Sequence, residues 1–357
     1  MQGKLVAASA LLASAGAAAI YFYKKKRALR LNLQDKQGNA VVVRLAVPED
    51  REQVKESIAD KTGTGSGTGN DDFLLQEYDR MVKDTQNITV LFVDDAKSGK
   101  GLGMMAVIWS SPTESYWQSL RVAEAARTRG IAKLLFQVAA QLAVDRQGPE
   151  SVSRWGVVSG NKIMTNWSER LRLKGPEAFR RHGAPANPAV PPLPAGYVLR
   201  KATLADVPAI MSRIASFPVA QSKFGTQNFV LHGWAAYNEA MLKAAISRAP
   251  SRGVPVPEPR LLYNTKGELI AFVNLAMIRF GPTWFLNQRY MDGTEGDGYE
   301  VLLHQLPALA AEYKCDAVGG YVPTLPWVLD TFERSPVFKR QTDTEQWEFH
   351  WKNVEHI

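Results

Sequence analysis

The chain has 357 residues, which suggests about two domains of roughly 150 residues, and its 45% hydrophobic and 22% charged residues are ordinary for a globular protein. The single cysteine, Cys315, excludes an intramolecular disulfide and a cysteine-based zinc site. Six of the basic residues, and no acid, lie in residues 1–34, so the rest of the chain carries only +2 of the net charge of +8. The charge therefore gives no support for nucleic-acid binding, and we expect neither a nucleic-acid partner nor a metal.

The N-terminus contains a long uncharged segment followed by a basic cluster. Residues 5–23 carry no charge, and Lys24, Lys25, Lys26 and Arg27 follow at once. As a helix the segment would span about 28 Å, close to the roughly 30 Å hydrocarbon core of a bilayer. The basic flank predicts a transmembrane signal anchor with the remaining domains in the cytosol, at the endoplasmic reticulum or the mitochondrial outer membrane. The alternative is an organellar import peptide, because the segment is basic and free of acids.

Two stretches of biased composition divide the rest of the chain. Residues 62–69 alternate Thr or Ser with Gly and are typical of a flexible loop. Residues 175–196 contain six prolines and predict an extended interdomain linker. The linker separates a domain at residues 40–174 from a domain at residues 197–357.

The two halves repeat one order of expected elements. Each has a strand leading into a helix, a hairpin, a further strand, an apolar helix that a glycine turn opens, and a last strand. These elements lie at residues 41–59, 89–109, 116–122, 130–144 and 154–158 in the first half, and at 197–215, 260–277, 284–290, 298–311 and 317–322 in the second. Repeats of about 160 residues predict duplicated α/β (α+β) domains, each a mixed sheet flanked by helices, and not a solenoid.

A strand-to-helix turn in the first half carries the clearest chemical pattern. The expected strand ends near Val122, and the turn and the first helical residues follow: Arg127, Thr128, Arg129, Gly130, Ile131 and Ala132. A helix N-terminus offers anions its free backbone N–H groups and the positive end of its dipole. Gly130 lets a phosphate approach the backbone closely, and the arginines add positive charge. The turn is therefore a candidate cradle for a pyrophosphate.

The motif Arg127-x-x-Gly130-x-Ala132, in this order of strands and helices, resembles the acetyl-CoA-binding motif of the GCN5-related N-acetyltransferase (GNAT) superfamily. The resemblance covers about residues 41–174. The run Leu120-Arg-Val-Ala, with weaker likeness elsewhere, resembles the histidine N-acetyltransferase-like branch of that superfamily. The resemblance implies tandem GNAT-like domains, acetyl-CoA as co-substrate without a metal, and a small-molecule amine as acceptor, such as the free amino acid histidine.

The resemblance also implies where acetyl-CoA binds. Pantetheine would lie between the strands at 116–122 and 154–158, which splay apart. The implied acetyl-CoA contacts are Leu120, Arg121 and Val122, the turn residues 127–132, and Asn161. A neutral amine would attack the thioester directly, while backbone N–H groups of the first strand stabilise the developing oxyanion.

The chain departs from the family at the positions of the acid and the base. Ser168 stands where a tyrosine usually serves as acid, and a serine hydroxyl is a poorer acid than a phenol, whose pKa is about 10. Either Ser168 assists the leaving thiolate, or water or another residue does, or the thiolate leaves without an acid. Gln118 stands where relatives often have a carboxylate, which leaves Glu114 and Glu124, at the two ends of the strand, as candidate bases.

The second half has a similar turn of different chemistry, Gly293–Gly298. Glu295 and Asp297 stand there in place of Arg127 and Arg129, and two carboxylates should repel a pyrophosphate. We therefore expect a degenerate domain that binds no CoA and instead walls the substrate cleft.

Two other functions remain open at this point. One is a protein or peptide N-acetyltransferase. The other is a membrane-tethered acetyl-CoA-binding pseudoenzyme, which the missing tyrosine and the missing carboxylate favour. The sequence carries no indication of an oligomeric state.

Overall fold

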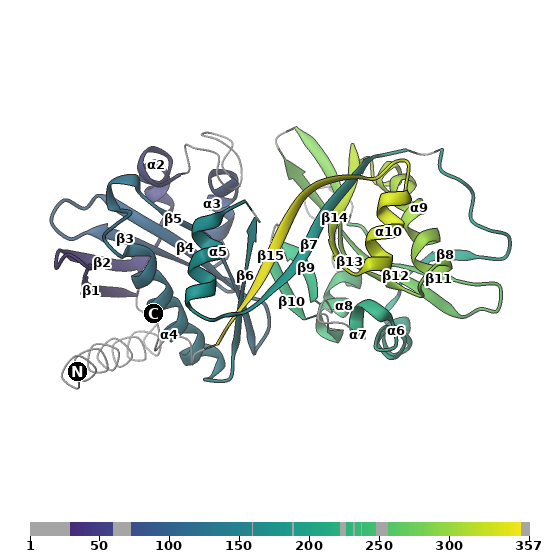
Figure 1. Cartoon of the computed structure of the whole chain (residues 1–357), viewed down its shortest axis with the longest axis horizontal. Coiled ribbons are helices and arrows are strands. Elements are labelled where there is room, and N and C mark those ends of the chain that lie inside the picture. Colours follow the sequence, from purple (N-terminus) through teal and green to yellow (C-terminus); the bar gives the residue numbers. More distant parts are fainter. Residues whose placement is uncertain are drawn as a thin grey trace. The chain divides into compact units, whose positions relative to one another are not determined.

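The computed structural model describes residues 29–59, 73–158, 160–187, 189–221, 226–230, 233–236, 238–247, 256–280 and 282–350. The expected anchor at residues 5–23 and the expected loop at 62–69 lie outside these ranges. Within them, no helix combines the length and the apolar character that crossing a membrane requires. The chain divides into two compact units, residues 1–175 with 347–357, and residues 176–346. Figure 1 labels their elements, and each unit is described by itself.

The first unit is built on a sheet in the order β1-β2-β3-β4-β5-β6. The first five strands pair antiparallel, and β6 joins β5 in parallel. The strands are β1 (Arg30–Gln34), β2 (Ala40–Leu45), β3 (Ile88–Asp95), β4 (Gly101–Trp109), β5 (Glu114–Val122) and β6 (Val152–Val158). The helices are α2 (Arg51–Gln53), which continues into a π-helical turn (Val54–Ile58), α3 (Phe73–Lys83), α4 (Ile131–Gln147) and α5 (Lys162–Arg170).

Helices cover both faces of this sheet. Neighbouring side chains of a strand point to opposite faces. On β5, Trp117 packs edge-on against Phe136 of α4 at 5.1 Å, and Phe136 packs at 4.3 Å against Trp167 of α5. The next residue, Gln118, points the other way and lies 3.5 Å from the sulfur of Met81 in α3. The strand β5 is therefore the middle layer between α4 and α5 on one face and α3 on the other.

The second unit repeats this plan with the sheet order β7-β14-β13-β12-β11-β8, in which only β13 and β14 pair in parallel. Its strands are β7 (Lys174–Pro185), β8 (Val198–Lys201), β11 (Arg260–Tyr263), β12 (Leu269–Phe280), β13 (Thr283–Gly293) and β14 (Ala317–Pro323). A separate hairpin joins β9 (Thr226–Val230) to β10 (Gly233–Ala236). The helices are α6 (Val207–Ile214), α7 (Pro218–Gln221), α8 (Glu239–Ile246), α9 (Asp297–Glu312) and α10 (Pro326–Arg334).

The same ion pair braces the start of each unit. Arg44 of β2 binds Asp50 at 2.7 Å, and Arg200 of β8 binds Asp206 at 2.6 Å. Each pair ties the first core strand to the helical turn that follows it. Together with the shared order of strands and helices, this confirms the duplication predicted from the sequence.

Two of the predicted boundaries are wrong. Residues 175–185, the beginning of the expected linker, belong to β7, because the backbone pairs with β14 from Phe179↔Pro323 to Pro185↔Ala317. The last strand, β15 (Lys339–His350), begins in the second unit, but Trp347–His350 group with the first. The second domain therefore does not hold the whole of residues 197–357.

Candidate active site

The strands β5 and β6 part after three residue pairs. Their parallel pairing runs from Glu114↔Val152 to Tyr116↔Arg154, although both strands continue beyond it. Just past this point the Tyr116 hydroxyl accepts a hydrogen bond of 2.7 Å from the backbone N–H of Gly156. A side chain thus takes the place of a backbone partner, and the expected splay between these strands is present.

A β-bulge lies on β5 beside the splay. Opposite it, β4 pairs Ala106 with Gln118 and Met104 with Arg121, so β5 contains one residue more than its partner. Ser119 has a φ of 58°, a left-handed conformation that is uncommon for a residue with a side chain. A bulge turns backbone groups out of the ladder. The structure therefore places redirected backbone next to the opening between the strands.

The turn after β5 presents free backbone donors. A 3-10 turn (Glu124–Ala126) leads to Gly130, which caps α4 in the left-handed conformation with a φ of 80°. Among the described residues, no hydrogen-bond acceptor is found for the N–H groups of Thr128, Gly130, Ile131 and Ala132. Four N–H groups at the positive end of a 17-residue helix fit a pyrophosphate.

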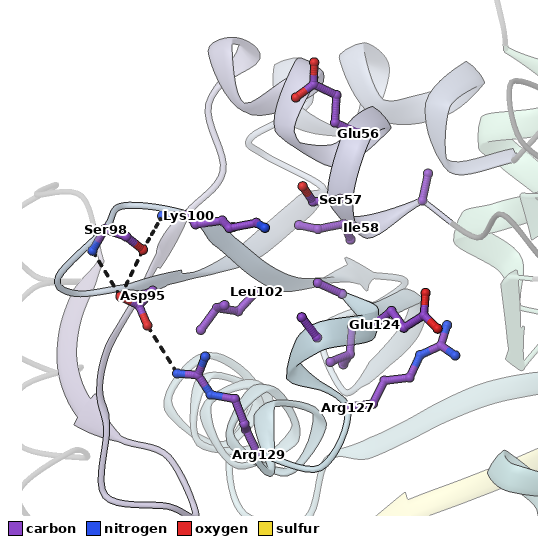
Figure 2. A pocket seen from close by; sticks show the side chains of 15 residues that line it. Glu56, Ser57, Ile58, Asp95, Ser98, Lys100, Leu102, Glu124, Arg127 and Arg129 are labelled. Atoms are coloured by element: carbon purple, nitrogen blue, oxygen red, sulfur yellow. Dashed lines mark hydrogen bonds and ion pairs between the residues drawn. The ribbon is translucent and has the colours of Figure 1, made fainter.

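A cavity of about 350 Å³ lies beside this turn. Its walls come from the π-helical turn after α2, the hairpin turn between β3 and β4, and the segment from Val122 to Arg129. In Figure 2, Arg127 and Glu124 lie on one side of the cavity, and Asp95 and Ser98 lie on the other. Neither Arg127 nor Glu124 forms an ion pair with a described residue, so both charges remain available to a ligand.

The comparison with known families agrees with this geometry. Residues 59–171, which include the bulge, the splay and the turn, match the family described as the acetyltransferase (GNAT) family. Residues 59–171 form a GNAT-family N-acetyltransferase domain. Acetyl-CoA is the co-substrate that this family implies, and the free N–H groups with Arg127 suit its pyrophosphate. A search of curated protein sequences finds no match.

Solved structures share the fold at low sequence identity. The chain is similar to a GCN5-related N-acetyltransferase from Sphaerobacter thermophilus, with a TM-score of 0.62, 13% identity, and coverage of 87% of this chain and 96% of the other. A tandem GNAT protein from the clavulanic acid biosynthesis pathway has a TM-score of 0.54 and 15% identity, with coverage of 87% of this chain and 98% of the other. A glucosamine N-acetyltransferase region of a fungal β-N-acetylglucosaminidase has a TM-score of 0.57 and 10% identity, with coverage of 87% of this chain and 38% of the other. These likenesses show the fold, which is consistent with tandem GNAT domains.

The acetyltransferase holds Arg129 differently from the expectation. Its Nε lies 2.6 Å from Asp35 and its Nη2 lies 3.3 Å from Asp95, so the guanidinium is paired with two carboxylates. Burial raises the pKa of Asp35, but hydrogen bonds from Arg129 and Asn39 outweigh it and lower this pKa to about 2. The positive charge expected from Arg129 at a pyrophosphate is therefore largely neutralised, and Arg127 is the cation of the turn that remains unpaired.

The side chains of the proposed acid, Ser168, and of one proposed base, Glu114, interact with other residues of the first unit. Ser168 is fully buried and its hydroxyl donates to the backbone carbonyl of Met164 at 2.9 Å, one helical turn earlier. Glu114 pairs with Arg154 at 3.1 Å at the closed end of the splay. A hydrogen bond within the helix and an ion pair thus account for these two side chains, and their roles as acid and base stay predictions. Glu124 is exposed and lines the cavity.

The remaining predicted contacts surround the turn and the start of α5. Leu120, Arg121 and Val122 follow the bulge, and Arg121 donates to the carbonyl of Leu120 at 3.1 Å. Asn161 caps α5, where its side-chain oxygen accepts the N–H of Met164 at 3.2 Å. Sequence reasoning missed Asp35 and Asp95. The Asp35-x-x-x-Asn39 turn was visible, but nothing in the sequence indicated a partner 94 residues away.

The alignment of the second unit with the first differs by one residue from the expectation. Gly296 caps α9 with a φ of 79°, as Gly130 caps α4. Glu295 is therefore the counterpart of Arg129, while Asp297 matches Ile131 and the counterpart of Arg127 is Gly293.

Proposed function

We propose that the acetyltransferase transfers the acetyl group of acetyl-CoA to the amine of a small molecule, with free amino acids such as histidine as the first candidates. The observation that carries this proposal is the bulged, splayed pair β5–β6 directly before a turn with four free N–H groups. The likeness of Leu120-Arg-Val-Ala123 to the histidine N-acetyltransferase-like branch supports the choice of acceptor.

In the proposed mechanism, residues 127–132 bind the pyrophosphate and the splay holds the pantetheine. Backbone N–H groups at the bulge then donate to the oxyanion that develops on the thioester carbonyl. The side-chain oxygen of Gln118 is buried and has no hydrogen-bond partner among the described residues, so it can accept an N–H from the incoming amine. An amide cannot remove a proton, and the amine therefore attacks in its neutral form.

The leaving thiolate needs little help in this mechanism. Thiols have pKa values near 8.5, so a thiolate is a far better leaving group than an alkoxide. As the C–N bond forms and the C–S bond breaks, the attacking nitrogen must lose a proton. With Ser168 bonded to Met164, we propose that water accepts this proton and passes one to the leaving thiolate.

We propose that the second unit binds no CoA. A β-carbon at Gly298, the counterpart of Ala132, would lie 2.4 Å from the carbonyl oxygen of Ile270, so its turn is packed closely against β12. Glu295 and Asp297 add negative charge at the same helix end.

For the N-terminus we propose a membrane anchor at residues 5–23, at the endoplasmic reticulum or the mitochondrial outer membrane, with the two units in the cytosol. The uncharged run and the basic cluster after it support this proposal. Organellar import is the alternative.

Calorimetric titration of acetyl-CoA into the full-length chain, followed by a panel of amino acids assayed for released CoA, tests the function. The proposal expects a stoichiometry near one and turnover on one amino acid. Binding without turnover on any amino acid would instead favour a peptide acceptor or a pseudoenzyme. A stoichiometry near two would show that the second unit also binds acetyl-CoA.

A further inference from the structure

Arg129 joins the pyrophosphate turn to two distant hairpins. Its guanidinium contacts Asp35, in the turn between β1 and β2, and Asp95, at the end of β3. Its backbone carbonyl also accepts the N–H of Lys36 at 2.9 Å. Three interactions therefore tie this one residue of the turn to other parts of the first unit, and Figure 2 shows the contact with Asp95 at the edge of the cavity.

Both carboxylates are themselves held in place by their own turns. Asp35 accepts the backbone N–H groups of Gln37 at 2.8 Å and Asn39 at 2.9 Å, and its side chain is fully buried. Asp95 accepts the backbone N–H and the hydroxyl of Ser98, both at 3.0 Å. A carboxylate fixed in this way cannot follow a moving arginine. The two carboxylates therefore fix the position of the Arg129 side chain, and do not merely neutralise its charge.

The second unit provides a contrast within the same chain. We call the two ion pairs of Arg129, with Asp35 and with Asp95, the brace. At the position of Arg129 the second unit has Glu295, which is exposed, and a carboxylate cannot form such ion pairs with acids. The N–H groups of Gly296, Asp297 and Gly298 also lack an acceptor among the described residues, so the brace and the unpaired Arg127, and not the free N–H groups, distinguish the first turn.

We propose that Asp35 and Asp95 are positioning residues for acetyl-CoA. By holding Arg129 they keep residues 127–130 in the conformation that presents the N–H groups to a pyrophosphate. The brace is formed during folding, so that little ordering is left for the moment of binding, and prior ordering of this kind raises affinity. This inference rests on the proposed acetyl-CoA site in the first unit.

The variant Asp35→Asn tests the brace. Asparagine retains the size of the side chain and one oxygen for the turn, but it removes the charge that pairs with Arg129. We expect the Kd for acetyl-CoA, measured by calorimetry on the full-length chain, to rise at least tenfold. If Arg129 instead bound the phosphate directly, the same variant would release its charge, and affinity would stay the same or increase. Either of those results overturns the proposal.

A matched control separates positioning from general destabilisation. Asp50→Asn removes an equally buried carboxylate that pairs with Arg44 at 2.7 Å in the same unit, away from the turn. We expect it to lower the melting temperature as Asp35→Asn does, but to leave the Kd within twofold of wild type. Equal weakening of acetyl-CoA binding by both variants would refute positioning.

A double-mutant cycle supplies a second readout. Arg129→Lys keeps the positive charge but loses the fork that contacts two carboxylates. In the background of Asp35→Asn it should weaken acetyl-CoA binding by less than threefold further, because the brace is already broken. Full additivity would contradict the proposal. Failure of the wild-type chain to bind acetyl-CoA would overturn the proposed function itself, an outcome distinct from all of these.

Discussion

Gly130 and Gly296 form a matched pair for testing the pyrophosphate turn. Both cap an apolar helix with a φ near 80°, but Gly130 (ψ 15°) is in the left-handed helical conformation, whereas Gly296 (ψ −115°) is in a conformation that essentially only glycine adopts. A residue with a β-carbon loses about 1–2 kcal/mol in the left-handed helical conformation of Gly130, and it is sterically less favourable still in the conformation of Gly296. A β-carbon at residue 130 would lie 3.2 Å from the β-carbon of Lys36, whereas at residue 296 no atom lies within 4 Å. Alanine should therefore cost stability at both positions, and more at residue 296 because of its backbone conformation.

The two substitutions should differ in acetyl-CoA binding. If Gly130→Ala turns the N–H groups out of alignment to relieve its strain, the same 1–2 kcal/mol appears as a loss of affinity of about 5- to 30-fold. Gly130→Asp should abolish binding, because it adds bulk and negative charge where the pyrophosphate would lie. Gly296→Ala should leave the affinity unchanged.

Thermal unfolding and calorimetric titration of the two variants test this reasoning. A loss of about 1 kcal/mol should lower the melting temperature by roughly 2–4 °C in a unit of this size. Wild-type affinity in both Gly130→Ala and Gly130→Asp, or an equal loss of affinity in Gly296→Ala, would show that the turn does not hold acetyl-CoA.

Two further predictions concern the acid and the base. Ser168→Ala should keep kcat within twofold of wild type, because its hydroxyl is bonded to the Met164 carbonyl; a drop of a hundredfold would restore it as the acid. Glu114→Gln should lower the melting temperature, since it breaks the pair with Arg154, without removing an ionisation from the pH profile of kcat/KM. A third prediction concerns pH, because burial raises the pKa of Asp292 to about 6. Between about pH 4 and pH 6 the folded state therefore holds a proton that the unfolded state has lost. The free energy of unfolding should fall by about 3 kcal/mol as the pH rises through this range. Urea unfolding should show this fall in the wild type and not in Asp292→Asn, and identical pH profiles would contradict the assignment.

Local sequence patterns were sufficient for most elements of the fold. The hairpin predicted at 260–277 begins with β11 and continues into β12, and the apolar run that Gly130 opens is α4. Alternation, apolar periodicity and glycine act over a few neighbouring residues, so they can be read without knowledge of distant partners. The same locality explains why the glycine turn before α4 and the repeated order of elements could be predicted.

Only the tertiary structure decided which side chains are available for chemistry. Ser168 and Arg129 looked free in the sequence, but one is buried against its own helix and the other is paired across 94 residues with Asp35. The proline-containing segment after Lys174 became β7 because β14, more than 130 residues later, pairs with it. Burial, ion pairing and strand pairing join residues far apart in the chain. The sequence by itself therefore determined the helices, the strands and the location of the turn, while long-range contacts determined which side chains of the turn are available to a ligand.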